Sequence, residues 1–252
     1  MPQLLFYERP VPLSPERHGD LRLAVRPDHH RFAAGVHAIP VTGTEMLDAA
    51  RDHPLAFQAQ DDGSWSVVAL VGLRPAENLR VDAQGRWQPG TYVPAFVRRY
   101  PFVLAHAAQG EDLTVCLDEA CAGLCRVEGE PLFDDTARPS QFLQTTLNFL
   151  QRFHAEAQRT QAFIQRLRSL DLRAPMPISV TVNHGAEGRA LPHLWRVDAE
   201  RYRQIPDEAV VALFRLGELS WIEAHLASLG QVTRLGERLA ARLDSAKDPG
   251  RS

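Results

Sequence analysis

The stretch from Ser140 to Asp171 reads SQFLQTTLNFLQRFHAEAQRTQAFIQRLRSLD, and it decides the fold. It contains neither glycine nor proline, so no residue in it interrupts an α-helix of roughly 48 Å. Its hydrophobic residues recur seven apart, at Leu143, Leu150, Ala157 and Ile164, with Phe153 and Leu167 beside them. This spacing predicts one continuous amphipathic helix over residues 140–171.

The opposite face of this helix is polar and equally regular. Arginine recurs at Arg152, Arg159 and Arg166. We expect the hydrophobic column to be buried and the arginine column to be exposed. A helix of this kind most often covers a sheet or joins a bundle. The alternative is a seam for self-association into a homo-oligomer, or for binding a partner.

Before Pro139 the sequence is typical of β-structure and loops. Valine-rich or alternating segments predict strands at residues 21–25, 36–41, 65–73, 102–104 and 113–117. Residues 82–85 (DAQG) predict the turn of a hairpin. The first half of the chain is therefore expected to be mostly antiparallel β-structure.

After the long helix the chain returns to strand and then to helix. Residues 178–182 alternate as a strand, and residues 194–198 are the expected return strand of the same hairpin. Pro206 is expected as the first residue of a helix, and Gly217 and Gly230 as glycines that end two helices. The prediction is an α+β fold in one domain, residues 1–243, with a flexible tail at 244–252.

Composition excludes several classes of protein. The chain has 252 residues, of which 44 % are hydrophobic and 23 % charged, with a formal charge of −3. Because acidic and basic residues are nearly equal in number, the composition gives no sign of the basic surface that binds nucleic acid. We therefore expect no nucleic-acid partner. The longest apolar run, residues 67–73, is far shorter than the ~20 residues that span a bilayer, so we expect no membrane insertion. The first residues do not resemble a secretory signal, and the three cysteines are an odd number, which together favour the cytoplasm.

The sequence carries no pattern that predicts a metal or a cofactor. Cys116, Cys121 and Cys125 have no fourth cysteine to complete a structural zinc site. His184 and His193 do not make an iron-binding signature. The nucleophile-elbow, phosphate-loop and dinucleotide-binding motifs do not occur. We expect His225 to be a packed histidine bonded to a backbone carbonyl.

One group of residues is a candidate binding site, because arginines beside carboxylates suit bidentate pairing and tyrosines near prolines suit an extended peptide. Its members are Tyr92, Arg98, Arg99, Tyr100, Asp118, Glu119, Glu130 and Asp134. We expect at least one of the two arginines to be bound to one of these four carboxylates. The alternative is a structural ion-pair network that fixes a loop on the sheet.

Several blocks in order resemble the SapC family of bacterial proteins, over nearly the whole chain from about Phe6 to Leu239. They are residues 78–87 (NLRVDAQGRW), 92–102 (YVPAFVRRYPF), 113–119 (LTVCLDE), 129–134 (GEPLFD), 158–163 (QRTQAF) and 217–226 (GELSWIEAHL). This family is named after a surface-array locus and is distinct from the peptide-transport permease of the same name. The resemblance carries over no catalytic residue. Relatives are often encoded near cupin-type oxygenases, flavin-dependent halogenase-like proteins and TonB-dependent receptors, which implies a helper role toward envelope proteins.

We therefore expect a non-catalytic accessory or binding protein linked to the cell envelope or surface layer. Its partner would be a protein or peptide, such as an envelope protein or the oxygenase that modifies it. Two alternatives stay open. One is a small-molecule enzyme that uses a cluster of Arg98, Arg99, Asp118 and Glu119. The other is a structural component of the surface layer, which would reach the surface by a route that the sequence does not show.

Overall fold

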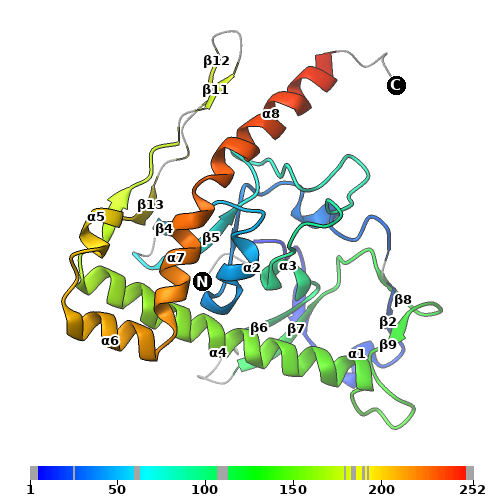
Figure 1. The fold of residues 1–252 in the computed structure, drawn as a ribbon. Helices are drawn as coiled ribbons and strands as arrows, with labels where there is room; N and C mark the ends of the chain where they lie inside the picture. The colour runs from blue at the N-terminus through cyan, green and yellow to red at the C-terminus, as the bar shows by residue number, and fades with distance from the viewer. Residues whose placement is uncertain are drawn as a thin grey trace.

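Helix α4 (Gln141–Ser169) lies along one side of the molecule (Figure 1). It contacts strands of two different sheets, β5 (Trp65–Leu70) and β6 (Phe102–His106). It confirms the long helix that the sequence predicts. The computed structural model describes residues 5–24, 26–59, 63–106, 113–178, 180–182, 186–188, 191 and 193–247.

Both ends of α4 are set by local sequence. The Ser140 side chain caps the first turn by accepting a hydrogen bond from the Leu143 amide at 3.1 Å. At the other end Asp171 takes a left-handed conformation with φ of 51°. The Leu172 amide then donates to the Leu167 carbonyl at 3.1 Å, as in a Schellman motif, and both leucine side chains are buried. The helix therefore ends before Pro175, the nearest proline.

A five-stranded antiparallel sheet with the order β10-β13-β4-β5-β3 forms the centre of the molecule. Val67 and Ala69 of β5 pack toward α4 and α7, whereas Val68 and Leu70 pack toward α8. Because both faces of β5 are covered, its sequence is continuously hydrophobic instead of alternating. The strands are β3 (Ala38–Pro40), β4 (Leu55–Ala59), β5 (Trp65–Leu70), β10 (Arg173–Pro175) and β13 (Leu194–Val197).

Three smaller antiparallel sheets complete the β-structure, with the orders β1-β7-β6, β8-β2-β9 and β11-β12. The first of them packs on the N-terminal half of α4. Their strands are β1 (Pro10–Pro12), β2 (Arg22–Leu23), β6 (Phe102–His106), β7 (Leu113–Asp118), β8 (Leu124–Cys125), β9 (Glu130–Pro131), β11 (Val180–Val182) and β12 (Ala186–Gly188).

The other helices are short except for the last two. Helix α6 runs beside the C-terminal half of α4, and α7 leads into α8, which extends away from the body (Figure 1). They are α1 (Pro15–His18), α2 (Met46–Ala49), α3 (Ala95–Arg98), α5 (Ala199–Tyr202), α6 (Asp207–Arg215), α7 (Glu218–Ser228), α8 (Gln231–Lys247) and the 3-10 turns η1 (Arg31–Ala33) and η2 (Gly43–Glu45).

Helix α4 joins two of the three hydrophobic clusters of the core. Its N-terminal half contributes Leu143 and Leu150 to the first cluster, which the β1-β7-β6 sheet also lines. Its C-terminal half contributes Phe163 and Ile164 to the second, between the central sheet and α7. The hydrophobic column is therefore buried as predicted, apart from Ala157, which is half-buried.

The α+β class is confirmed, with mostly antiparallel strands before the long helix and helices at the end. The predicted hairpin after α4 is wrong in its pairing. Strand β11 pairs with β12, while β13 lies between β10 and β4 of the central sheet. Ser179 and the turn at 183–185 lie outside the described residues. The hairpin at 82–85 is reduced to a single bridge between Val81 and Trp87.

Two details of the C-terminal helices also differ. Pro206 is the N-cap of α6 and not its first helical residue, because its ψ of 148° is extended. Gly217 takes the left-handed conformation, with φ of 75°, and ends α6 as predicted. Gly230 follows Leu229, the C-cap of α7, as predicted, but it is not among the glycines with positive φ. Helix α8 reaches Lys247 and so includes the first residues of the segment expected as a tail.

Candidate functional site

A buried carboxylate, Glu45, fixes the loop that carries the two candidate arginines. Its Oε2 accepts hydrogen bonds from the Thr42 amide at 3.0 Å and from the Thr42 hydroxyl at 2.8 Å. Its Oε1 accepts from the Ala95 amide at 2.6 Å and from the Tyr92 hydroxyl at 2.9 Å. Burial, followed by the Glu45 charge, raises the pKa of Tyr92, which stays a neutral donor. Sequence reasoning missed Glu45, although Thr42–Glu45 has the T-x-x-E spacing of a capping box.

Arg98 stands at the end of α3 with its guanidinium exposed. Its Nε donates to the Val93 carbonyl at 3.1 Å, and its Nη2 to the Tyr92 hydroxyl at 3.3 Å. Its guanidinium also lies 5.5 Å from the ring of Phe149 on α4. The carboxylate paired with it is Glu45, at 3.8 Å, which is long for an ion pair and leaves Arg98 able to bind another anion.

Arg99 is mostly buried, and aromatic rings surround it. Its guanidinium lies 3.8 Å from the ring centre of Phe96 and 5.0 Å from that of Phe153, which is close enough for cation–π attraction. The ring of Tyr7 is 5.8 Å away. Burial lowers the pKa of Arg99, and its Nε is buried without a hydrogen-bond partner in the described structure.

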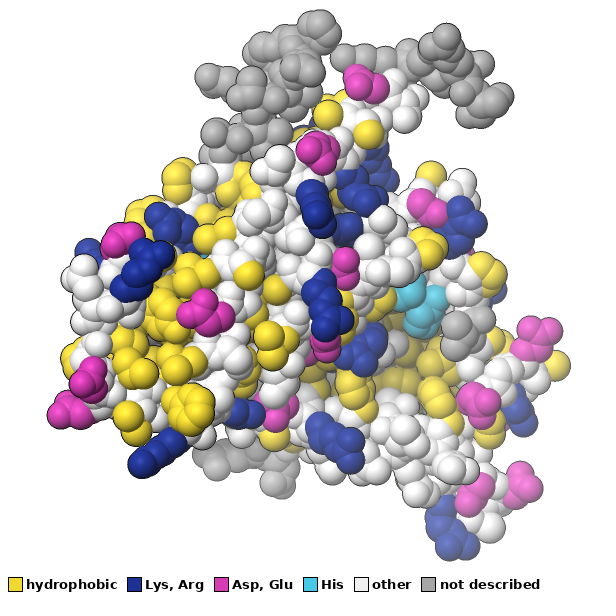
Figure 2. Space-filling model, in the orientation of Figure 1, with side chains coloured by type: hydrophobic (Ala, Val, Ile, Leu, Met, Phe, Trp, Pro, Cys, Tyr) yellow, Lys and Arg dark blue, Asp and Glu magenta, His cyan; other side chains and the backbone are white. Residues whose placement is uncertain are grey.

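A pocket of about 400 Å³ opens between this loop and the N-terminal half of α4. In Figure 2 it is part of a recessed area of hydrophobic side chains, with histidine at its rim. The lining combines two cations with aromatic and aliphatic walls and includes no carboxylate among the described residues. The lining residues are Leu23, His29, Arg98, Arg99, Tyr100, Phe102, Phe142, Thr145, Thr146 and Phe149.

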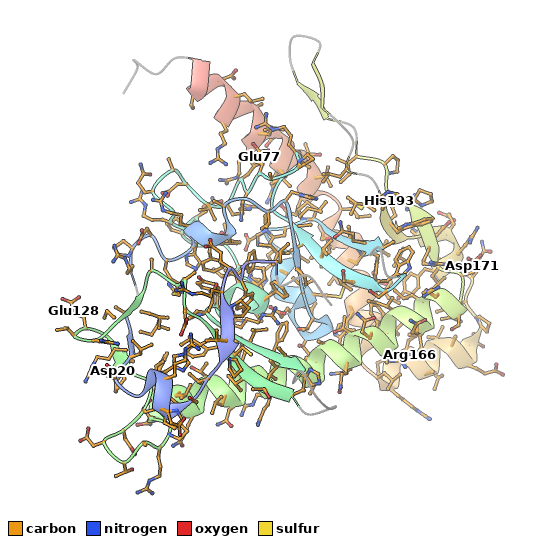
Figure 3. All side chains as sticks on the ribbon, turned by 180° about the vertical axis from the view of Figure 1, so that it is seen from behind. Asp20, Glu77, Glu128, Arg166, Asp171 and His193 are labelled. Carbon is orange, nitrogen blue, oxygen red and sulfur yellow. The ribbon has the colours of Figure 1, made fainter. Side chains whose placement is uncertain are left out.

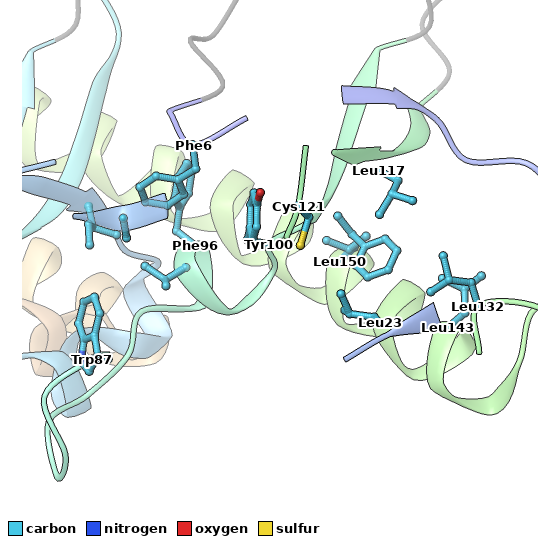
Figure 4. Packing of buried hydrophobic residues seen from close by; sticks show 14 of the residues in the cluster. Phe6, Leu23, Trp87, Phe96, Tyr100, Leu117, Cys121, Leu132, Leu143 and Leu150 are labelled. Carbon is cyan, nitrogen blue, oxygen red and sulfur yellow. The ribbon is translucent and has the colours of Figure 1, made fainter. Parts of the chain in front are cut away.

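Tyr100 forms the inner part of this pocket. Its ring stacks on Phe32 with a centroid separation of 3.9 Å, and it lies between Phe96 and Cys121 (Figure 4). Burial is the main cause that raises the pKa of Tyr100, with smaller contributions from Cys121 and Asp118. Tyr100 therefore presents a neutral aromatic surface at physiological pH.

Three of the four candidate carboxylates have partners other than Arg98 and Arg99. Asp118 is fully buried and accepts hydrogen bonds from the backbone amides of Glu8 (3.0 Å) and Arg9 (2.9 Å). Glu119 binds Arg17 through two hydrogen bonds of 2.6 and 2.8 Å. Asp118 thus holds the N-terminal segment against the end of β7, and Glu119 holds α1 to the residue that follows β7.

The remaining two are exposed. Asp134 accepts hydrogen bonds from the amides of Thr136 (2.8 Å) and Arg138 (3.0 Å), which closes its own turn. Glu130 is an exposed residue of β9. The prediction that Arg98 or Arg99 binds one of the four carboxylates is wrong, because backbone amides and other arginines are the partners of three of them.

The structure thus brings Arg98, Arg99 and Tyr100 together in one pocket, with Tyr92 beside it. Sequence reasoning missed the wall that α4 provides. Phe142 and Phe149 lie seven residues apart, directly beside the buried Leu143 and Leu150 column, and that spacing was the available signal. His29, which also lines the pocket, is half-buried, and burial lowers its pKa.

Comparison with family models places the whole arrangement in one family. The model described as SapC matches residues 13–235, which includes every residue of the pocket. The chain belongs to the SapC family. No curated protein and no solved structure matches it.

Other features of this SapC-family chain bear on the remaining predictions. Cys116, Cys121 and Cys125 are free thiols, and no group of metal-ligating side chains is found among the residues that the structure describes. His184 lies outside those residues. His225 is buried as predicted, and its Nε2 accepts a hydrogen bond from the Val197 amide at 3.0 Å. In the described part of the chain no helix is both long and apolar enough to cross a bilayer.

Proposed function

We propose that this SapC-family chain is a non-catalytic binding protein that recognises a protein or peptide partner at the pocket between Arg98 and Phe149. The observation that carries the proposal is the pairing of two guanidinium groups with an aromatic wall in a lining without carboxylates. Binding sites for protein and small ligands combine apolar walls with a few charged groups in this way.

The lining offers little for catalysis. The hydroxyl of Thr145 donates to the Gln141 carbonyl at 2.9 Å, and that of Thr146 donates to the Phe142 carbonyl at 3.0 Å. Both hydroxyls are therefore engaged within α4 and are poor candidates for a nucleophile. Asp118 and Glu119, which an enzyme of this cluster would use as acid or base, are engaged with backbone amides and Arg17.

The family supports a partner in the cell envelope. A protein of the surface layer, or the oxygenase that modifies such a protein, fits the helper role that the family resemblance implies. This part of the proposal rests on family membership alone, whereas the location of the binding site rests on the geometry.

Affinity capture from the source organism tests the proposal with four forms of the full chain. Wild type and Arg168→Ala, an exposed change in the C-terminal half of α4, away from the pocket, should retain the same partner. Arg98→Ala and Phe149→Ala should lose it while keeping the wild-type circular dichroism spectrum. If the pocket variants still capture the partner, the pocket is not the binding site. If purified chain instead turns over a small acid, the enzyme alternative replaces the proposal.

A further inference from the structure

We infer that the pocket binds the C-terminal residue of the partner, with the free carboxylate on Arg98 and Arg99 and a large apolar side chain against α4. This inference rests on the proposed function and specifies the chemistry of its ligand.

The two arginines of the pocket indicate that its ligand carries a negative charge. Glu45, the carboxylate nearest Arg98, already accepts hydrogen bonds from Ala95 and Tyr92 on the same oxygen that faces the arginine. Arg99 lies against the rings of Phe96 and Phe153 and shares a hydrogen bond with Tyr7. Its buried Nε lacks a hydrogen-bond partner, and no ion pair of Arg99 is found among the described residues. A buried cation without a counter-charge is costly, and a bound carboxylate would supply both the charge and the missing acceptor.

The aromatic walls of the pocket indicate that the same ligand also carries an apolar group. Phe142 and Phe149 of α4 face Tyr100 and Phe102 across the cavity. Since these rings are half-buried or buried in the free chain, a ligand ring can remove their remaining surface from water without rearranging the core.

The size of the pocket suits a short ligand instead of a long peptide segment. A volume of about 400 Å³ is near the lower end of the range of roughly 300–1,000 Å³ for small-ligand sites. In a peptide, a single residue carries both a carboxylate and an aromatic or large aliphatic side chain only when it is the C-terminal residue. An internal Asp or Glu would need a second residue to fill the apolar part of the pocket.

His29 contributes no charge to this recognition at neutral pH. Burial lowers its pKa, so the imidazole is neutral there and the anion is held by the two arginines alone. The groups facing His29 are the rings of His30 and Phe32 and the carboxylate of Asp28. Affinity should therefore change little between pH 7 and pH 8 and should decrease with added salt.

Calorimetric titration of the full chain with two capped tripeptides provides the test. Both end in phenylalanine, one as the free acid and the other as the amide. We expect the acid to bind at least tenfold more tightly, and Arg98→Gln to remove most of that difference. Phe149→Ala should weaken both peptides, and Arg168→Gln, in the C-terminal half of α4, should change neither. Thermal unfolding of each variant checks that it is folded.

The outcomes separate the inference from the proposed function. Equal affinity for acid and amide, lost in Phe149→Ala, overturns carboxylate recognition but leaves a peptide site in the pocket. Absence of peptide binding, with capture of the partner still dependent on Arg98, also overturns the inference alone. If 3-phenylpropionate binds as tightly as the peptide acid, the ligand is a free aromatic acid. The peptide assignment and the proposed function then fail together.

Discussion

The two halves of α4 have the same sequence pattern but different surroundings. Phe149 and Phe163 are two sevenfold repeats apart and so belong to one column of the helix. Phe163 is fully buried, with the ring of Trp221 from α7 at 5.2 Å and that of Phe57 from β4 at 6.3 Å. Phe149 is half-buried and faces Arg98 across the pocket. A helix column thus becomes part of the core or the wall of a pocket according to what the rest of the chain places over it.

The charges differ in the same way. In the C-terminal half, Arg166 donates two hydrogen bonds to Glu218, whose side chain is fully buried at the start of α7. Figure 3 shows Arg166 on this half of α4, far from Asp20 and Glu128 at the other end of the molecule. This pair also corrects the prediction that the whole arginine column is exposed. Near the N-terminal half of α4, Arg99 has no equivalent acid as an ion-pair partner among the described residues.

The largest expected effect separates the two phenylalanines. Phe163→Ala should lower the free energy of unfolding by about 3–5 kcal/mol, because it removes a fully buried ring and leaves a cavity. Phe149→Ala, its matched control, should cost only about 1 kcal/mol, because its ring is already partly in water. Urea unfolding of both variants measures the difference, and equal losses would mean that the two halves are packed alike.

Acid should lower the stability of the region that packs on the C-terminal half of α4. Burial lowers the pKa of His225 to about 3, and His225 packs against Phe57. The folded state therefore binds this proton less readily than the unfolded state, whose histidine has a pKa near 6.5. The stabilisation is complete above about pH 6.5 and is lost as the pH falls, by up to about 1.4 kcal/mol per unit.

The measurement is the free energy of unfolding at pH 6.5 and pH 4.5 for wild type and for His225→Gln. The variant should show a smaller loss on acidification, by roughly 2–3 kcal/mol, even if it is less stable at pH 6.5. His53, whose pKa burial lowers to about 4, contributes in the same direction in both proteins. An identical pH dependence in the two proteins would show that His225 becomes protonated without unfolding.

Breaking the ion pair should have an intermediate effect. Glu218→Gln removes the charge but keeps the size of the side chain, and it leaves Arg166 without its buried partner. Loss of one member of a fully buried pair costs about 3–5 kcal/mol, but the Arg166 side chain is 34 % exposed, so we expect about 2 kcal/mol. Arg166→Met provides a second arm. If it restores the stability of Glu218→Gln in the double variant, the cost comes from the unpaired cation.

The smallest effect tests the exposed arginines. Arg159 donates to the Leu216 carbonyl at 2.6 Å, and its guanidinium lies 4.7 Å from the ring of Trp221. Arg159→Ala should therefore cost about 1 kcal/mol, more than a solvated residue would. Arg152→Ala should cost less than about 0.5 kcal/mol. Indistinguishable thermal midpoints for the two variants would mean that the Arg159 contacts do not stabilise the fold.

The candidate site was partly predictable. The Arg98–Tyr100 segment stood out because two arginines and a tyrosine follow one another, and all three line the pocket. The wrong part was the set of partners. Asp118 and Glu119 follow a strand, as predicted, but Asp118 is satisfied by backbone amides and Glu119 by Arg17, a residue 102 positions away.

Sequence by itself determined the features that depend on neighbours along the chain. The length of α4, its cap at Ser140, the burial of the Leu143 and Leu150 column and the left-handed turn at Gly217 follow from periodicity and local backbone preference, which act over a few residues. Tertiary structure alone decided which charges meet and which column stays open. A buried ion is stable only beside a partner, and the partner of Arg166 or of Arg98 is a residue about fifty positions away that only the folded chain brings near.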